Sequence, residues 1–113
     1  MSEQAVFDTL AYRIEVDSYG NRFYYNNAGK WHRENGPAVE YANGSKRWYY
    51  KGQLHRTDGP AIEYPNGAKF WVQNNLLHRT DGPAVEYFNG ELQWWIHGEH
   101  MSEAKYKQVV KSL

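Results

Sequence analysis

The sequence repeats itself with a period of 23 residues. His32, His55 and His78 are each followed by an arginine, two further residues and the tripeptide Gly-Pro-Ala. Self-similarity at such a period is typical of a repeat array, in which each unit buries its apolar face against its neighbours. We therefore predict a single repeat domain over 1–113, made of a degenerate half-repeat at 12–31, full repeats at 32–54, 55–77 and 78–100, and a C-terminal helix at 102–113.

Two turn signals divide each repeat into short strands. Asn-Gly recurs at 43–44, 66–67 and 89–90, and it predicts a type I′ hairpin turn because both central residues of that turn need positive φ. The segments between the turns alternate apolar with polar residues and are rich in aromatics, which is typical of half-buried strands. The predicted fold is therefore mainly β, an elongated antiparallel meander. A second tight turn is expected at Lys51-Gly52, Asn74-Asn75 and His97-Gly98.

Aromatic residues hold fixed positions within the repeat. Trp48, Trp71 and Trp94 each follow the turn glycine by four residues, and Tyr24 stands in the same position of the half-repeat. Aromatic side chains make up 17% of the chain, while its mean hydropathy is −0.90. This combination indicates a thin structure held by flat side chains, and we expect the tryptophans of successive repeats to stack as the core.

The segment WVQNNLLHRTDGPAVEYFNG, residues 71–90, resembles the MORN repeat, most closely its variant MORN-like form. Similar His-Arg-x-Asp-Gly-Pro-Ala arrays occur in small phage and prophage proteins. The resemblance covers about 12–100 and implies an elongated, twisted, single-layer antiparallel sheet that acts as a scaffold for binding. The His-Arg-Thr-Asp-Gly-Pro segment is longer than in common MORN repeats. For that reason the properties of lipid-binding or junctional MORN proteins are not carried over.

The C-terminal segment has a different pattern. Ser102 is a suitable N-cap, Glu103 falls in the first turn, and apolar residues from Tyr106 to Leu113 follow helical spacing. An array needs its open end covered, so we interpret this helix as a cap over the last hairpin. A helix that binds a partner is the alternative interpretation.

The repeated His-Arg-x-Asp set contains side chains that could catalyse proton transfer or bind a metal. Catalysis needs one constellation with distinct roles, whereas this set is copied, and Asn35 replaces the aspartate in the first copy. We interpret the set as turn scaffolding, with Asp58 accepting from backbone amides and Gly59 at positive φ. The histidine is expected to donate to a carbonyl or to the aspartate, and the arginine to pair with Glu63 or a neighbouring aspartate. No catalytic residue, metal ligand or cofactor is predicted.

Composition narrows the class of partner. Thirteen basic and thirteen acidic residues give a formal net charge of zero, so no global field attracts nucleic acid or an anionic membrane. Basic residues interleave with aromatics in the first half of the chain, and this leaves a nucleotide or nucleic-acid binder as an alternative function. The absence of cysteine and of any long apolar stretch leads us to expect a cytoplasmic protein.

We expect a non-enzymatic scaffold that binds another protein. The phage resemblance makes a host defence protein the expected partner, with the chain acting as an anti-CRISPR-like inhibitor; a small enzyme is the third hypothesis. A homodimer through a sheet edge or the C-terminal helix is also expected, because a meander leaves two edge strands. Residues that vary within the fixed frame are free for recognition, and aromatic and arginine side chains dominate interface energies. The predicted partner-binding residues are the exposed members of Tyr49, Tyr50, Phe88, Trp95 and Ile96, together with Arg47.

Overall fold

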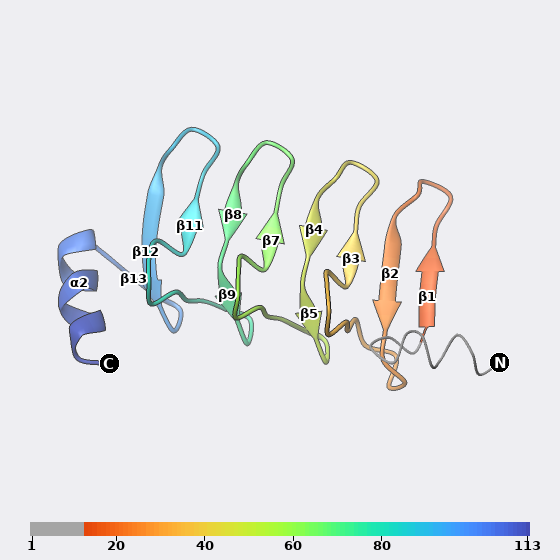
Figure 1. The fold of residues 1–113 in the computed structure, drawn as a ribbon, viewed down its shortest axis with the longest axis horizontal. Coiled ribbons are helices and arrows are strands. Elements are labelled where there is room, and N and C mark those ends of the chain that lie inside the picture. Colours follow the sequence, from red (N-terminus) through yellow and green to blue (C-terminus); the bar gives the residue numbers. More distant parts are fainter. Residues whose placement is uncertain (1–12) are drawn as a thin grey trace.

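The computed structural model describes residues 13–113. Within them one antiparallel sheet of nine strands runs along an array that measures 54 × 29 × 18 Å, and a single helix follows at the C-terminal end (Figure 1). The predicted mainly β meander with a C-terminal helix is confirmed. The strands of this sheet, in spatial order, are β1 (Arg13–Val16), β2 (Arg22–Tyr25), β3 (Val39–Glu40), β4 (Lys46–Arg47), β7 (Ile62–Glu63), β8 (Lys69–Phe70), β11 (Val85–Glu86), β12 (Leu92–Ile96) and β13 (Glu99–Met101).

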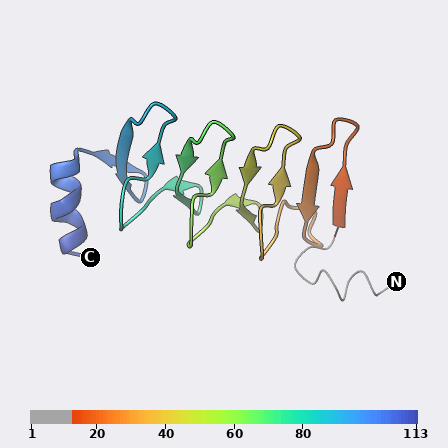
Figure 2. The same ribbon diagram turned by 45° about the horizontal axis from the view of Figure 1, so that its top comes forward.

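Each repeat also carries a second, shorter hairpin below the main sheet. The hairpins are formed by β5 (Tyr49–Tyr50) with β6 (Gln53–Leu54), and by β9 (Val72–Gln73) with β10 (Leu76–Leu77). In the last repeat β12 is continuous, and its second half pairs with β13. Seen from the tilted direction, the four upper hairpins stand in a row above a line of lower turns (Figure 2).

The prediction of type I′ turns at the Asn-Gly tips is wrong, and the second set of tight turns, at the opposite ends of the strands, has that geometry instead. At the lower turns both central residues have positive φ, for example 51° at Lys51 and 84° at Gly52, as a type I′ turn requires. At the upper tips only the glycine does, with φ of 95° at Gly44. There Gly44 N–H donates to Tyr41 O at 3.0 Å, so the tip is a three-residue loop that ends in a left-handed glycine. The asparagine serves a different purpose: Asn43 Oδ1 accepts from Ser45 N–H at 2.8 Å.

The core consists of small residues repeated in each unit together with a few large side chains such as Tyr24 and Tyr106. The most buried apolar side chains include Ala38, Val39, Ala61, Ala84 and Val85. The predicted stack of tryptophans is wrong, because within residues 13–113 no ring of Trp48, Trp71 or Trp94 packs on another of the three. These rings are half-buried: those of Trp48 and Trp71 pack on arginine side chains instead, and that of Trp94 packs on Tyr106.

The helix α2 (Glu103–Lys111) covers the C-terminal end of the array. Ser102 is its N-cap and accepts from the Lys105 N–H, as predicted. Tyr106 is 3% exposed, and its ring lies 4.9 Å from that of Trp94. In the part of the chain that the structure describes, no helix has the length and apolar character needed to cross a membrane.

Candidate binding surface

The repeated histidine holds the lower turn of its own repeat. His32 Nδ1 accepts from Lys51 N–H at 2.8 Å, His55 Nδ1 from Asn74 N–H at 3.0 Å, and His78 Nδ1 from His97 N–H at 2.9 Å. The prediction that this ring donates to a carbonyl or the aspartate is therefore wrong at Nδ1, which accepts. Since the ring accepts at Nδ1, its proton resides on Nε2. Burial, together with the neighbouring His97, lowers the pKa of His78.

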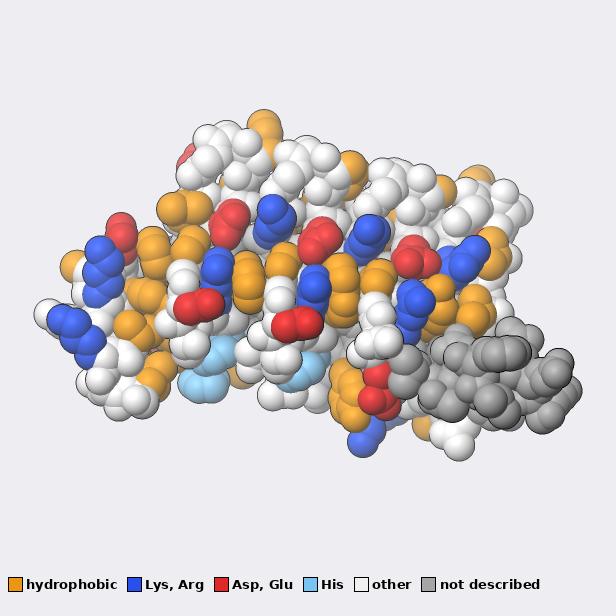
Figure 3. Space-filling view, viewed as in Figure 1, with side chains coloured by type: hydrophobic (Ala, Val, Ile, Leu, Met, Phe, Trp, Pro, Cys, Tyr) orange, Lys and Arg blue, Asp and Glu red, His pale blue; other side chains and the backbone are white. Residues whose placement is uncertain are grey.

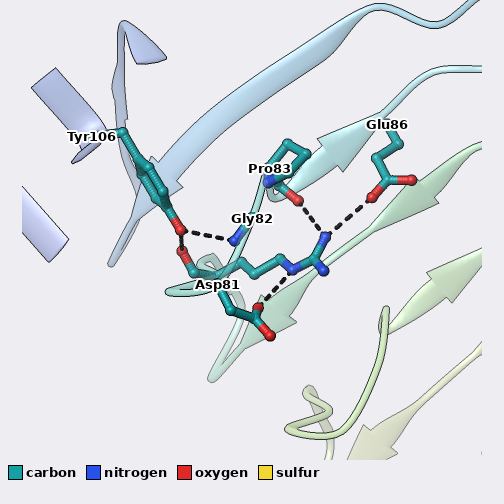
Figure 4. Close-up of polar contacts among 6 residues, drawn as sticks. Asp81, Gly82, Pro83, Glu86 and Tyr106 are labelled. Carbon is teal, nitrogen blue, oxygen red and sulfur yellow. Dashed lines mark hydrogen bonds and ion pairs between the residues drawn. The ribbon is translucent and has the colours of Figure 1, made fainter. Parts of the chain in front are cut away.

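The repeated arginine forms a clamp, which Figure 4 shows for the third copy. Arg79 donates from Nε to Asp81 at 2.8 Å, and from Nη1 to the Pro83 carbonyl at 3.0 Å and to Glu86 at 3.1 Å. Beneath it the ring of Trp71, from the preceding repeat, lies 3.8 Å from Cζ. Arg56 makes the equivalent bonds to Asp58, Pro60 and Glu63 over Trp48.

The predicted pairing of this arginine with Glu63 is confirmed, but the role given to the aspartate is wrong. Asp58 Oδ1 accepts from the Nε of Arg56 at 2.9 Å. The hydrogen bond from Arg56 and its positive charge lower the pKa of Asp58. The aspartate thus orients the guanidinium that joins two repeats.

The glycine of this motif is required by contact with the arginine. Positive φ was predicted for Gly59, yet it does not occur among the positive-φ residues. A Cβ at Gly59 would lie 2.6 Å from the Cζ of Arg56, and one at Gly82 would lie 2.8 Å from the Cζ of Arg79. Only a residue without a side chain leaves room for the clamp.

Through these contacts the repeated histidine, arginine and aspartate hold the turns and join neighbouring repeats. Among residues 13–113 there is no group of three or more His, Cys, Asp or Glu side chains arranged to hold a metal ion. The second and third copies are the same in every polar contact of the arginine. Only the first copy differs in this arrangement, because Asn35 stands there in place of the aspartate.

In the first copy the clamp is incomplete. Arg33 donates through Nη1 to the Pro37 carbonyl at 3.2 Å and lies 3.5 Å from Glu40. Asn35 replaces the aspartate, and within residues 13–113 the Nε of Arg33 has no acceptor. Glu34 turns instead toward His32, with its carboxylate 3.4 Å from Nε2. The guanidinium still lies over an aromatic ring, 3.9 Å from that of Tyr24.

Beside this arginine lies a groove of about 570 Å³ between the first and second His-Arg loops. Tyr50 is part of its lining, is 39% exposed, and stands between the rings of His32 at 4.7 Å and His55 at 6.4 Å. The same frame position holds Gln73 and Ile96 in the later copies. The groove is lined by residues 33–36, Trp48, Tyr50 and residues 55–58.

The predicted partner-binding residues do not form one surface. Tyr50 is exposed in the groove and Phe88 is 70% exposed at the last upper tip. Tyr49 packs on Trp31, with ring centroids 5.0 Å apart, and Trp95 stacks on His100 at 4.7 Å. Arg47 is half-buried and donates to the Tyr64 hydroxyl at 3.3 Å. Ile96 is only 6% exposed, so its assignment to a binding surface is wrong.

Above the clamps a second row of charge crosses the same face (Figure 3). Cross-strand pairs alternate in sign along it: Arg22 faces Glu40, Lys46 faces Glu63, and Lys69 faces Glu86 where strands of successive repeats meet. Opposite charges placed directly across an antiparallel pair stabilise the sheet and fix its register. The charges on this face are therefore balanced, in keeping with the zero net charge.

Sequence reasoning missed Arg33, Asn35 and His55 as members of one groove. The available signal was the replacement of aspartate by Asn35 in an otherwise fixed frame, together with an aromatic at position 50. The sequence does not reveal that these two residues line the same groove, because Asn35 lies in a loop and Tyr50 lies in β5, 15 residues further along the chain.

No protein-family model, no curated protein and no solved structure matches the chain.

Proposed function

We propose that this protein is a cytoplasmic, non-enzymatic repeat scaffold that binds another protein through the groove beside Arg33 and Tyr50. The observation that carries the proposal is the incomplete clamp. In two copies the aspartate accepts from the Nε of the arginine, whereas in the first copy, where Arg33 lines the groove, this Nε has no such partner in residues 13–113. Arginine and tyrosine side chains grouped in one concave site are the usual anchors of protein interfaces.

The side chains that line the groove indicate which chemical groups a partner would place there. A guanidinium such as that of Arg33, whose Nε has no acceptor within residues 13–113, binds a carboxylate through paired hydrogen bonds. The ring of His55 accepts from Asn74 N–H at Nδ1, which leaves Nε2 as a further donor. The exposed ring of Tyr50 offers a flat surface for an apolar side chain. A loop that carries an acidic residue next to an apolar one fits this combination. The resemblance to small phage repeat proteins makes a host defence protein the partner class to test first, with inhibition as the outcome.

The experiment is affinity capture followed by a binding measurement on the captured protein. Asn35→Asp would give Arg33 the carboxylate that the other copies have, and it should close the site without disturbing the frame. Loss of binding on Asn35→Asp and on Tyr50→Ala, with binding retained on Phe88→Ala, supports the proposal. Retention of full affinity by Asn35→Asp would refute the groove as the binding site.

A nucleotide is the second candidate ligand, favoured by the size of the groove. A volume of about 570 Å³ lies within the range of small-molecule sites, and Tyr50 and Arg33 could stack a base and bind a phosphate. Titration with AMP, followed by the NMR signals of the groove residues, tests it. Saturable shifts that disappear in Asn35→Asp would favour the nucleotide over the protein partner.

A further inference from the structure

Within residues 13–113, part of the outer edge of β12 has no neighbouring strand; α2 packs against the same strand, with the Tyr106 ring on Trp94. At all three internal junctions the strand that descends from an upper tip pairs with the first strand of the next repeat, β2 with β3, β4 with β7 and β8 with β11. In the third copy β13 pairs only with the half of β12 from Trp94 to Ile96. Leu92 and Gln93 pair with β11 on one side, and within residues 13–113 no strand pairs with their other side.

The sequence of this open edge differs from the edges that are paired internally. The equivalent dipeptides are Arg22-Phe23, Lys46-Arg47 and Lys69-Phe70, each with at least one positive charge, whereas the last is Leu92-Gln93. The internal lysines face glutamates of the next repeat. Leu92 replaces that lysine and is 50% exposed. A charged edge needs an oppositely charged neighbour, and an uncharged edge can pair with its own copy without repulsion.

We propose that the open edge of β12 pairs antiparallel with the same edge of a second copy, so that the protein is a symmetric dimer. Residues directly opposite in an antiparallel pair lie on the same face of the sheet. With the two-fold axis at Leu92, this residue faces Leu92 of the second copy, and Gln93 faces Glu91 of the second copy. The apolar pair buries the exposed leucines, and the amide can donate to the carboxylate.

A symmetric pair is favoured over head-to-tail stacking on β1. Stacking would place Leu92 opposite Val16, which is 58% exposed. In its hairpin Val16 pairs with Arg22 and so stands where the later hairpins have a glutamate, for example Glu40 opposite Lys46. That contact joins unlike surfaces and does not close, so it would produce open filaments. The symmetric pair closes with two copies and leaves the groove between the first two loops free, so this proposal stands independently of the proposed function.

The test is the mass in solution of the full chain and three variants, measured by light scattering over a dilution series. Leu92→Lys restores the residue found at Lys46 and Lys69 and can face Glu86, as Lys46 faces Glu40 and Lys69 faces Glu63. It should keep the fold but place two ammonium groups opposite each other at the axis. Val16→Glu is the matched control at the other end of the sheet. Leu92→Thr, which introduces a polar β-branched residue that suits a strand, replaces Leu92→Lys if that variant fails to fold.

We expect twice the monomer mass of 13.3 kDa for the wild type and for Val16→Glu, and the monomer mass for Leu92→Lys with an unchanged circular dichroism spectrum. A monomeric wild type at every concentration would overturn the proposal, as would a dimeric Leu92→Lys. Loss of association in both single variants, with recovery as long assemblies in the Leu92→Lys/Val16→Glu double variant, would establish head-to-tail stacking instead.

Discussion

The guanidinium of Arg79 lies 3.8 Å above the ring of Trp71 and belongs to the next repeat along the array. The same relationship joins Arg56 to Trp48 and Arg33 to Tyr24, at 3.9 Å in each case. At the end of the array Tyr106 of the helix takes the place of the next arginine on Trp94. Its hydroxyl also donates to the Arg79 carbonyl at 2.6 Å and accepts from the Gly82 N–H at 3.1 Å. Cohesion between repeats thus depends on a ring covered by a polar side chain.

Removal of a central ring should therefore separate neighbouring repeats. Trp71→Ala deletes the surface on which Arg79 rests and leaves a cavity, and we expect a loss of about 3 to 5 kcal/mol in the free energy of unfolding. Urea denaturation followed by circular dichroism measures it. Phe88→Ala, at an exposed tip, is the control and should change stability by roughly 0.5 kcal/mol or less. Equal stability of the two variants would show that the ring is not part of the cohesion.

Alanine at the motif glycine should displace the arginine clamp. In Gly59→Ala the new Cβ would lie 2.6 Å from the Arg56 Cζ, so we expect a loss of about 1 to 3 kcal/mol from overpacking. Gly36→Ala is the matched variant in the first copy. There the new Cβ would lie 3.1 Å from the Arg33 Cζ, and the guanidinium makes fewer hydrogen bonds that a displacement could break, so we expect a smaller loss of stability. Thermal denaturation of both variants checks the order, which would be reversed if the glycine served only to bend the chain.

Stability should fall when the pH is lowered through the histidine range. Burial and His97 lower the pKa of His78 below its usual value of 6.5, so the unfolded state takes up this proton more readily than the folded state. The contribution of the neutral ring is complete above about pH 6.5 and is lost as the pH falls through the lowered pKa. Protonation also removes the Nδ1 acceptor from the His97 N–H. Urea midpoints measured between pH 7.5 and 5 test this dependence.

His78→Asn is the control for the pH prediction. Its amide oxygen can accept the hydrogen bond from the turn but does not titrate. The variant should be less sensitive to pH over this range than the wild type. An identical pH profile in both proteins would mean that other groups cause the loss.

The fold follows from the sequence because its turns and period are explicit. Asn74-Asn75 and His97-Gly98 have the residue types that tolerate positive φ, and the pattern around Ser102 and Tyr106 defines the helix and its cap. The sequence does not reveal which side chain each repeated residue contacts. The ring of Trp71 could pack equally well on another tryptophan or on Arg79. Only the spacing of the strands in the folded array places the arginine over it.

The candidate site was predictable only in part. Tyr50 was identified from its variation within the frame, and it lines the groove. Ile96 satisfies the same criterion but is buried, because variation within the frame does not distinguish an exposed position from a buried one. Arg33 was missed because its residue type is unchanged; only the loss of the aspartate at Asn35 alters what it can bind.

The most direct test of the account is the affinity of Asn35→Asp for the captured partner, measured beside wild type and Phe88→Ala by calorimetry. A carboxylate at position 35 should accept from the Nε of Arg33, as Asp58 and Asp81 accept from the Nε of their arginines. We therefore expect the affinity to fall, with Kd rising about tenfold or more, which is equivalent to roughly 1.4 kcal/mol of binding free energy. Phe88→Ala should bind as the wild type does. Unchanged affinity for Asn35→Asp together with lost affinity for Phe88→Ala would contradict the account and move the binding surface to the hairpin tips.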